Sequence, residues 1–317
     1  MGLGASNGAL ASQHPAFDRC PACGHEPVVA QGCAVCGFVP ATVDGFTAFA
    51  PELAHEGTGF DPAHFQVLAQ LEAAHFWFQA RNEWIVSALQ RHFADARSFL
   101  EIGCGTGFVL QAVARALPHL ALSGSELFVD GLSVAAERVP HAQLFQMDAA
   151  RVPFRERFDV IGAFDVLEHV EDDVGALAGF ARALTPGGGV VLSVPQHAWL
   201  WSAQDEHAHH VRRYAAQELT QLLEIAGFEI LEQRSFVSLL LPALVASRLF
   251  AASTSASDDP YRELRLPGWL NRACRGVMRL EAGLSERGAR LPFGSSRLVV
   301  ARQRVAHASA QLLEGGT

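Results

Sequence analysis

The spacing of apolar residues changes along the chain, and each change predicts a different element. From residue 98 onward, short apolar runs alternate with stretches in which apolar residues recur every three or four positions. The short runs predict buried strands, and the stretches predict helices with one face on a core. The predicted strands cover residues 98–102, 120–126, 142–147, 158–164, 188–195, 228–236 and 296–302. The predicted helices cover residues 108–117, 129–139, 172–184 and 215–226. This alternation predicts an α/β fold, with a parallel sheet covered by helices on both faces.

The rest of the chain divides by composition and periodicity into segments around this core. The first 16 residues are rich in Gly, Ala and Ser and are predicted to be disordered. A helical pattern runs from Asp61 to Phe93. The resulting division is 1–16 disordered, 17–50 cysteine-bearing ribbon, 51–97 helical lead-in, 98–236 with 293–304 α/β core, 237–292 helical insertion and 305–317 C-terminal tail.

Composition then narrows the functional classes. The chain has 317 residues, which is enough for one large domain with attachments. Its formal net charge of −9 argues against broad, nonspecific binding of nucleic acid. No basic segment followed by an apolar one opens the chain, so we predict no secretory signal and expect a cytoplasmic location.

Four cysteines near the N-terminus have the spacing of a metal site. They form two Cys-x-x-Cys-Gly pairs, one at Cys20 and Cys23 and the other at Cys33 and Cys36. Such pairs place four thiolates around one tetrahedral point, which predicts a structural zinc site with no position left for substrate. Iron is the main competing metal. Disulfides are a poor alternative for adjacent pairs in a chain without an export signal.

The first predicted strand ends in a glycine-rich turn, which is typical of a cofactor loop. The segment 100–107 reads Leu-Glu-Ile-Gly-Cys-Gly-Thr-Gly, and a predicted helix follows it. A dinucleotide site requires a third glycine where this chain has Phe108, and its phosphates would be repelled by Glu101. An NAD-dependent oxidoreductase is therefore excluded, and a ligand with a positive amino group is favoured.

These residues resemble motif I of the class I S-adenosylmethionine (SAM)-dependent methyltransferases, and the resemblance extends from Phe76 to Arg304 without the insertion. It implies a Rossmann-like sheet of seven strands whose last strand is antiparallel, with the cofactor at the carboxyl ends of the strands. In that family Glu126 would accept the ribose hydroxyls and Asp148 the adenine amino group. Arg81 can reach the methionine carboxylate of the cofactor from the preceding helix, or it can have an ordinary role on the helix surface. The implied cofactor-binding residues are Glu101, Gly103, Gly105, Gly107, Glu126, Leu127, Asp148, Ala149, Phe164 and Arg81.

The segment from Asp165 to Val170 also resembles the ubiquinone-biosynthesis O-methyltransferases, and three interpretations of it stay open. Glu168 and His169 can cap the next helix, or His169 can act as a general base. In the third interpretation Asp165, Glu168 and His169 hold a catalytic divalent ion, as this spacing does in some relatives.

The loop after the fifth core strand is the expected acceptor side. Its His210-x-Arg-Arg-Tyr sequence resembles bacterial methyltransferases that act on glycan, lipid-linked or secondary-metabolite substrates. We expect His210 to take a proton from an acceptor hydroxyl or amine. Arg212 or Arg213 can bind an anionic group of the acceptor, or else Arg213 and Tyr214 only anchor the loop.

The insertion combines an apolar stretch with a basic one. Residues 236–252 are apolar, but Pro242 and Arg248 interrupt them, and the stretch is too short to span a membrane. Residues 261–291 carry seven arginines against three acids. The insertion can thus contact a membrane surface or a lipid-linked acceptor, or it can form a helical cap over the cleft or a dimer contact.

These observations predict a SAM-dependent methyltransferase that modifies O or N of a small, sugar- or lipid-linked acceptor. The alternative is a catalytically silent scaffold with the same fold, whose zinc ribbon docks a partner. The intact Glu101, Glu126, Asp148 and three motif glycines argue against the scaffold.

Overall fold

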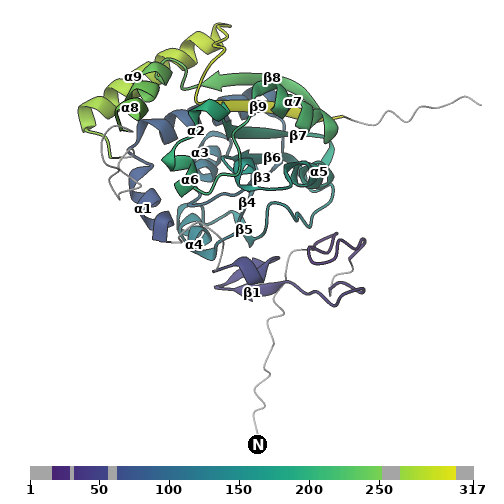
Figure 1. Cartoon of the computed structure of the whole chain (residues 1–317). Coiled ribbons are helices and arrows are strands. Elements are labelled where there is room, and N and C mark those ends of the chain that lie inside the picture. The colour runs from purple at the N-terminus through teal and green to yellow at the C-terminus, as the bar shows by residue number, and fades with distance from the viewer. Residues whose placement is uncertain (1–15, 29–31, 56–62, 252–264, 305–317) are drawn as a thin grey trace, which may run out of the picture.

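The computed structural model describes residues 16–28, 32–55, 63–251 and 265–304 (Figure 1). Most of the predicted disordered N-terminus, the whole C-terminal tail and the start of the basic stretch at residue 261 lie outside the described residues.

A nine-stranded mixed sheet runs through the centre of the molecule in the order β1-β2-β5-β4-β3-β6-β7-β9-β8 (Figure 1). Its strands are β1 Ala41–Val43, β2 Phe46–Ala48, β3 Ser98–Ile102, β4 Ala121–Glu126, β5 Gln143–Gln146, β6 Phe158–Phe164, β7 Leu184–Pro195, β8 Phe228–Phe236 and β9 Ser296–Gln303. The strands from β2 to β7 in this order are parallel to one another, while β9 is antiparallel to both β7 and β8. All seven predicted core strands are present, and the antiparallel position of the last one is confirmed.

The predicted core of seven strands is confirmed, and a hairpin from the cysteine-bearing segment adds two further strands at its edge. Strands β1 and β2 form this hairpin, and β2 pairs in parallel with β5. The ring of Phe49, which follows β2, lies 6.0 Å from that of Phe145 and 5.5 Å from that of Phe154. Apolar periodicity could not reveal this pairing, since each added strand has only three residues.

Helices cover both faces of the sheet, and two apolar cores result. Helices α5 (Asp173–Ala183) and α7 (Ala216–Ile225) contribute to the core on one face, together with Phe17 and Phe49. Helices α2 (Phe76–His92) and α3 (Phe108–Ala116) contribute to the core on the other. Helix α4 (Val129–Arg138) lies against β4 and β5. The strands are therefore buried on both faces, which explains their continuous apolar runs.

The predicted helical stretch from Asp61 to Phe93 is two helices rather than one. Helix α1 covers Ala63–Leu71, and α2 begins at Phe76 after a break. His75 is the N-cap of α2, and its side chain accepts a hydrogen bond from the backbone N–H of Trp77. The residues of the break are ordinary helix formers, so no local sequence signal marks it. In the folded chain Asn271 binds backbone groups on both sides of His75, accepting from the N–H of Phe76 at 2.8 Å and donating to the carbonyl of Ala74 at 2.6 Å.

The insertion forms α8 (Leu241–Ala251) and α9 (Gly268–Glu286), at the upper left in Figure 1. Helix α9 packs against α2, and Asn271 accepts a hydrogen bond of 2.8 Å from the backbone N–H of Phe76. The backbone N–H groups of Ser238 and Leu239 donate to Glu281, which is fully buried. The insertion is thus a helical cap on α2, and no helix within the described ranges is long and apolar enough to cross a membrane.

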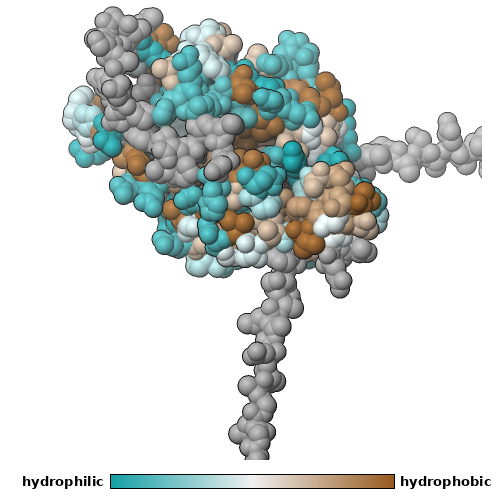
Figure 2. All heavy atoms as spheres, turned by 60° about the horizontal axis from the view of Figure 1, so that its bottom comes forward, coloured by the Kyte–Doolittle hydropathy of each residue, from teal (hydrophilic) through white to brown (hydrophobic). Residues whose placement is uncertain are grey.

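Short helical segments complete the loops at the carboxyl ends of the strands. They are η1 Pro51–Leu53, η2 Leu167–His169, η3 Ala198–Leu200 and α6 Ala203–His207. On the face shown in Figure 2, hydrophilic and hydrophobic residues interleave over the surface of the described residues.

Candidate active site

The glycine turn follows β3 directly and closes over the carboxyl end of the sheet. All three motif glycines have positive φ angles, and a Cβ on Gly103 would lie 2.4 Å from the side chain of Val166. Gly107, with a φ of 73°, is the N-cap of α3, so the amino end of that helix faces the turn. The turn therefore needs glycine for both its conformation and its packing, and it directs backbone N–H groups at a ligand.

Glu101 lies below this turn and is almost completely buried. One of its carboxylate oxygens, Oε2, has no hydrogen-bond partner among the described residues. Burial raises the pKa of Glu101 well above its usual value, although the charge of Arg81 opposes the rise. A buried acid with an unused oxygen suits a ligand that brings a positive amino group.

Glu126, at the end of β4, connects the turn to the next strand. Its Oε2 accepts a hydrogen bond of 2.9 Å from the backbone N–H of Gly105, and its Oε1 accepts one of 2.8 Å from Leu127. Burial raises the pKa of this carboxyl group above its usual value. The structure thus brings Glu126, Leu127 and the glycine turn together, with the remaining lone pairs of the carboxylate available to hydroxyl donors.

Asp148 and Ala149 follow β5 at the same edge of the sheet, as predicted from their strand-end positions. Oδ1 of Asp148 accepts a hydrogen bond of 2.9 Å from the backbone N–H of Ala150. Its Oδ2 lies 3.6 Å from the guanidinium of Arg151, a half-exposed pair that the sequence did not suggest.

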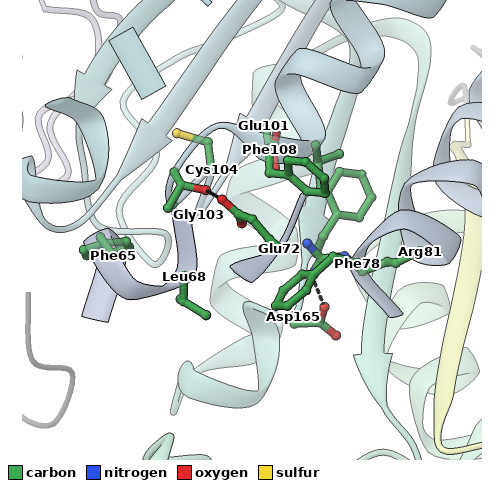
Figure 3. Close-up of a pocket in the computed structure, with 14 residues that line it drawn as sticks. Phe65, Leu68, Glu72, Phe78, Arg81, Glu101, Gly103, Cys104, Phe108 and Asp165 are labelled. Carbon is green, nitrogen blue, oxygen red and sulfur yellow. Dashed lines mark hydrogen bonds and ion pairs between the residues drawn. The ribbon is translucent and has the colours of Figure 1, made fainter. Parts of the chain in front are cut away.

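A cavity of about 150 Å³ lies between the turn and helices α1 and α2 (Figure 3). It is lined by Phe65, Leu68, Glu72, Phe78, Arg81, Glu101, Gly103, Cys104, Gly105, Thr106, Phe108, Val109, Phe164 and Asp165. Pockets that hold a drug-sized ligand have about 300–1,000 Å³. The cavity is smaller than this range, because helix α1, which contributes Phe65 and Leu68 to its lining, covers the turn.

A buried ionic network holds α1 in that position. Glu72 accepts a hydrogen bond of 2.6 Å from the hydroxyl of Thr106 in the turn and pairs with Arg138 at the end of α4. Arg138 also donates to the backbone carbonyl of Ala69 at 2.9 Å. Sequence reasoning missed Glu72 and Arg138, because no local motif marks a contact between residues 66 positions apart.

Arg81 enters the cavity from α2, but its partner is a protein carboxylate. Its guanidinium forms a 2.5 Å ion pair with Asp165 (Figure 3), and it also lies over the ring of Trp77. Asp165 has a φ of 58°, which is strained for a residue other than glycine. It follows Phe164, which lines the cavity, so Arg81, Phe164 and Asp165 meet where β6 ends.

The predicted acceptor side is built from two segments that are far apart in sequence. Ligand atoms of Glu168, His169 and His210 all lie within 4.8 Å of one another. This group differs from the predicted one, which contained Asp165 in place of His210. Asp165 forms an ion pair with Arg81 instead. The helix-capping interpretation is also wrong, since Asp172 caps α5 through a 2.9 Å hydrogen bond from the N–H of Gly175.

His210 is oriented by Asp205, which lies in the expected acceptor loop but whose role no local motif marks. The Nδ1 of His210 lies 2.9 Å from Asp205, and Arg213 binds both oxygens of that carboxylate at 2.7 and 2.9 Å. Burial alone would raise the pKa of Asp205, but hydrogen bonds from His210, Arg213 and Ser202 lower it below its usual value. Asp205 therefore stays ionised and fixes the orientation of the imidazole.

The two arginines of this loop anchor it rather than face an open pocket. Arg212 pairs with Asp173 at 2.7 Å and donates to the backbone carbonyl of Glu171. Arg213 forms an ion pair with Asp205. The structure therefore favours the anchoring interpretation over binding of an anionic acceptor.

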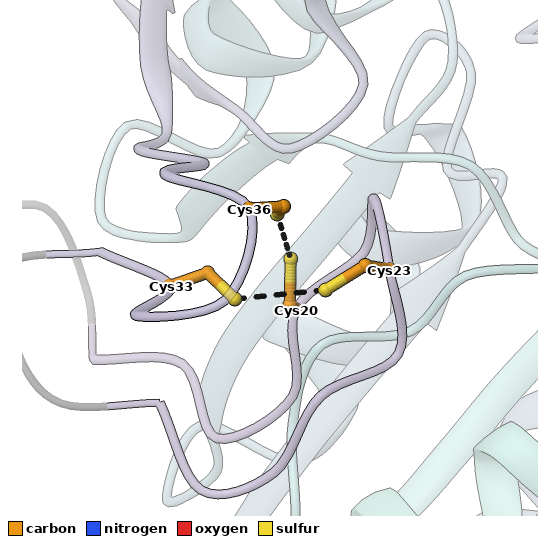
Figure 4. A group of neighbouring side chains, drawn as sticks. All are labelled: Cys20, Cys23, Cys33 and Cys36. Carbon is orange, nitrogen blue, oxygen red and sulfur yellow. Dashed lines mark hydrogen bonds between the residues drawn. The ribbon is translucent and has the colours of Figure 1, made fainter.

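The four N-terminal cysteines converge on one point, as their spacing predicts (Figure 4). The sulfur of Cys20 lies 3.5 Å from that of Cys36, and the sulfur of Cys23 lies 3.6 Å from that of Cys33. Four sulfurs about 2.3 Å from a tetrahedral zinc ion lie roughly 3.8 Å apart. The separations are far too long for disulfides, and the cluster is compatible with a structural zinc ion.

Comparison with known proteins agrees with this geometry. Residues 70–233, more than half of the chain, match the family described as Methyltransferase domain. A protein of Mycolicibacterium smegmatis named as a probable S-adenosylmethionine-dependent methyltransferase is 32% identical over 165 residues, covering 50% of this chain and 62% of that protein. A ubiquinone biosynthesis O-methyltransferase of Hahella chejuensis is 29% identical over 142 residues, covering 38% of this chain and 57% of that protein. The chain thus spans about three fifths of the length of these relatives.

Among solved structures, a chain of the complex between the Trm112 methyltransferase activator and a methyltransferase of Haloferax volcanii has a TM-score of 0.51 and 17% identity. The match covers 78% of this chain and 95% of that one, and it supports the fold alone. The family match includes the glycine turn, Glu126, Asp148 and the segment of His210. The chain therefore belongs to the methyltransferase-domain family of class I SAM-dependent methyltransferases.

Proposed function

We propose that this protein transfers the methyl group of SAM to an oxygen or nitrogen atom of a small, sugar-linked or lipid-linked acceptor. One observation carries the proposal. The glycine turn with Glu101 and Glu126 lies at the same sheet edge as a histidine held by a buried carboxylate. The glycine turn with its two acids suits the methyl donor. The histidine held by a carboxylate suits a nucleophile that must lose a proton.

Methyl transfer from a sulfonium donor needs mainly alignment, exclusion of water and removal of one proton. In the metal-free site, we assign the proton to Nε2 of His210, because Asp205 holds Nδ1 on the opposite side of the ring. His169 is a weak base, since burial and the neighbouring His210 and His209 lower its pKa to about 4. Its imidazole is therefore neutral at pH 7 and better suited to positioning the acceptor.

Each residue on the donor side would contact a particular part of SAM. Glu126 would accept the ribose hydroxyls, and Asp148 with Ala149 would contact the adenine. Arg81 has a second role open to it, because a methionine carboxylate can compete with Asp165 for the guanidinium. The four cysteines would hold a structural zinc ion that takes no part in the transfer.

The outer face of α9 supports a lipid-linked acceptor or contact with a membrane surface. Trp269, Leu280 and Leu284 are exposed along one side of this helix, next to the exposed Arg272 and Arg279. Apolar side chains beside arginines suit the boundary of an anionic bilayer. Cosedimentation with anionic vesicles tests this part, and protein that stays entirely in the supernatant would remove it.

Calorimetric titration of the purified protein with SAM, with its demethylated product and with NAD tests the donor assignment. We expect both sulfur compounds to bind and NAD not to bind. A radiolabelled methyl transfer assay against a panel of hydroxyl and amine acceptors then tests turnover. Binding of SAM without transfer to any acceptor would favour the silent scaffold, and no binding of SAM by folded protein would reject both.

A further inference from the structure

We propose that His197, Trp199 and Phe293 form a subsite on which a ring of the acceptor stacks, and that this ring carries an oxygen substituent, as sugar and phenol rings do. The subsite rests on the proposed function, because it names the kind of acceptor that the same site takes. It is built from the segment after β7 and the segment before β9. These segments lie side by side, since the backbone N–H of Gln196 donates to the carbonyl of Ser295 at 2.8 Å.

Large aromatic rings are exposed where the two segments meet. Trp199 and Phe293 are each 61% exposed. The ring of His197 contacts both, with its centroid 5.5 Å from that of Trp199 at an angle of 27° and 6.0 Å from that of Phe293 at 37°. Nearly parallel rings at these separations are offset, so each leaves part of its face uncovered. The three rings, called the aromatic cluster below, thus offer a surface on which a further ring can stack.

The backbone holds the aromatic cluster in place. His197 has a φ of 64° and a ψ of 112°, which is strained for a residue other than glycine. Such strain persists only where the surroundings impose it, and it gathers at sites that bind ligands. Gly294 fixes the other segment beside Phe293, because a Cβ on Gly294 would lie 2.3 Å from the carbonyl oxygen of Phe236.

A buried chain of hydrogen bonds determines which ring nitrogen of neutral His197 carries the proton. Nη2 of Arg297 donates to the hydroxyl of Ser235 at 3.1 Å, and this hydroxyl donates to Oε1 of Gln196 at 3.0 Å. Gln196 therefore turns its amide N–H group toward His197, whose Nε2 lies 2.7 Å away and must accept. The proton is then on Nδ1, which can donate to an oxygen of the acceptor.

The charge of Arg297 argues against a cationic acceptor. Arg297 is 7% exposed, its Nε has no hydrogen-bond partner, and no carboxylate within the described ranges pairs with it. Burial lowers the pKa of its guanidinium, which nevertheless stays protonated, as it does throughout proteins.

This positive charge reaches the aromatic cluster. Burial, Arg297 and Arg213 together lower the pKa of His197 below its usual value, so its imidazole is neutral at pH 7. Exposed aromatic rings alone would also suit a quaternary ammonium group. Arg297, which lacks a paired acid, would repel that group and attract an oxygen. The subsite therefore favours a neutral or anionic ring over an ammonium group.

The aromatic cluster is connected to the proposed base through one carboxylate. Arg213 binds Asp205 and also donates to the carbonyl of Gln196, the residue before His197, at 3.2 Å. Asp205 in turn holds Nδ1 of His210. The same contacts thus position both the surface for the ring and the group that takes its proton.

Ligand-detected saturation-transfer NMR on the zinc-loaded full chain tests the subsite, with methyl β-glucoside, p-cresol and tetramethylammonium as probes. We expect at least one of the two rings to bind and the ammonium ion not to bind. Trp199→Ala should weaken ring binding by about tenfold. His197→Phe keeps a stacking face but loses the N–H donor, and it should weaken binding by about fivefold. Trp269→Ala is the matched control, since Trp269 is a similarly exposed tryptophan on α9, and it should bind the ring as the wild type does.

The three probes also distinguish the possible acceptors. Binding of the glucoside alone assigns a sugar ring, and binding of p-cresol alone assigns a phenol ring. The subsite would be overturned if neither ring bound the wild type at millimolar concentration, or if tetramethylammonium bound in their place. Ring binding by Trp199→Ala as tight as that by Trp269→Ala would overturn it too.

Calorimetry with SAM on every variant shows that the variant is folded, and it separates the two proposals. If Trp199→Ala does not bind SAM and is unfolded, Phe293→Ala takes its place with the same expected loss. Wild-type protein that binds SAM but neither ring would overturn the subsite and leave the proposed function standing. Wild type that binds a ring but not SAM would reject the proposed function alone.

Discussion

The proposed donor side and the proposed acceptor side of the site share one edge of the sheet but are built in different ways. On the donor side, Glu101 and the three glycines lie within seven consecutive residues, and Glu126 reaches them from the neighbouring strand. On the acceptor side, His210 meets Glu168 and His169 across about forty residues of chain. The donor side is fixed by backbone conformation, and the acceptor side by side-chain and loop contacts. Substitutions should therefore affect the two sides separately.

The largest effect is expected at Gly103. Replacement by alanine puts a methyl group 2.4 Å from Val166 at a φ of 68°, so the turn must move. We expect the affinity for SAM to fall by about a hundredfold or more, because binding depends on close backbone approach. Calorimetry measures the loss.

Gly187→Ala is the matched control for this change. Gly187 also has a positive φ, of 81°, but a Cβ added there would meet no atom within 4 Å beyond its chain neighbours. It should lose roughly 1 kcal/mol of stability from backbone strain alone and keep its affinity for SAM. Equal losses of SAM affinity in both variants would mean that general strain, and not the turn, controls binding.

Asp205→Asn is expected to have the next largest effect, confined to the acceptor side. The amide cannot accept both the His210 and Arg213 contacts as a carboxylate does, so His210 loses its fixed orientation. We expect kcat to fall by about ten- to a hundredfold with an acceptor that the panel identifies. The Kd for SAM should not change.

Asp172→Asn is the control, since asparagine also caps helices well and Asp172 is exposed. A purely structural role for Asp205 would appear as a lower melting temperature with kcat and KM intact. A change in the Kd for SAM as large as the change in kcat would break the separation of the two sides.

The same difference between local and long-range contacts explains which features of the molecule the sequence could predict. The seven core strands were predictable because a strand buried on both faces is apolar throughout its length. The glycine turn and the cysteine pairs were predictable because their chemistry lies in a few consecutive residues. Asp205, Glu72 and Arg138 were not, since each acts through a partner that only the folded chain brings near. The β1–β2 hairpin was missed for the same reason.

Loss of the cysteine site is expected to act on the donor side from a distance. Strand β2 pairs with β5, and Asp148 lies in the segment that follows β5. Phe17 and Phe49 join the main core. Cys36→Ser would weaken a bound zinc ion, loosen this edge and lower the affinity for SAM by about tenfold, since closed zinc sites contribute directly to folding. Melting curves and calorimetry measure both effects.

Cys274→Ser is the control, because Cys274 lies on α9 outside the cluster. Quantification of bound zinc in the two variants should show a loss only in Cys36→Ser. Zinc-depleted protein that kept its melting temperature would show that the hairpin and the aromatic contacts hold this edge without metal.

The smallest effect on the site is expected from Glu72→Gln, which tests whether α1 belongs functionally to the donor side. Glutamine keeps the shape and can still accept a hydrogen bond from Thr106, but it removes the charge that offsets the partly buried Arg138. We expect a loss of stability of about 1–3 kcal/mol and a change in the Kd for SAM of less than about tenfold, since Glu72 covers the turn without forming it.

Faster dissociation of SAM at nearly unchanged kcat, with the dissociation measured by stopped-flow fluorescence of the tryptophans, would place α1 over the bound cofactor. Exposed Glu83→Gln on α2 is the control. Equal dissociation rates in the wild type and both variants would show that the ionic network stabilises α1 without retaining the cofactor, and the donor side would then end at the glycine turn.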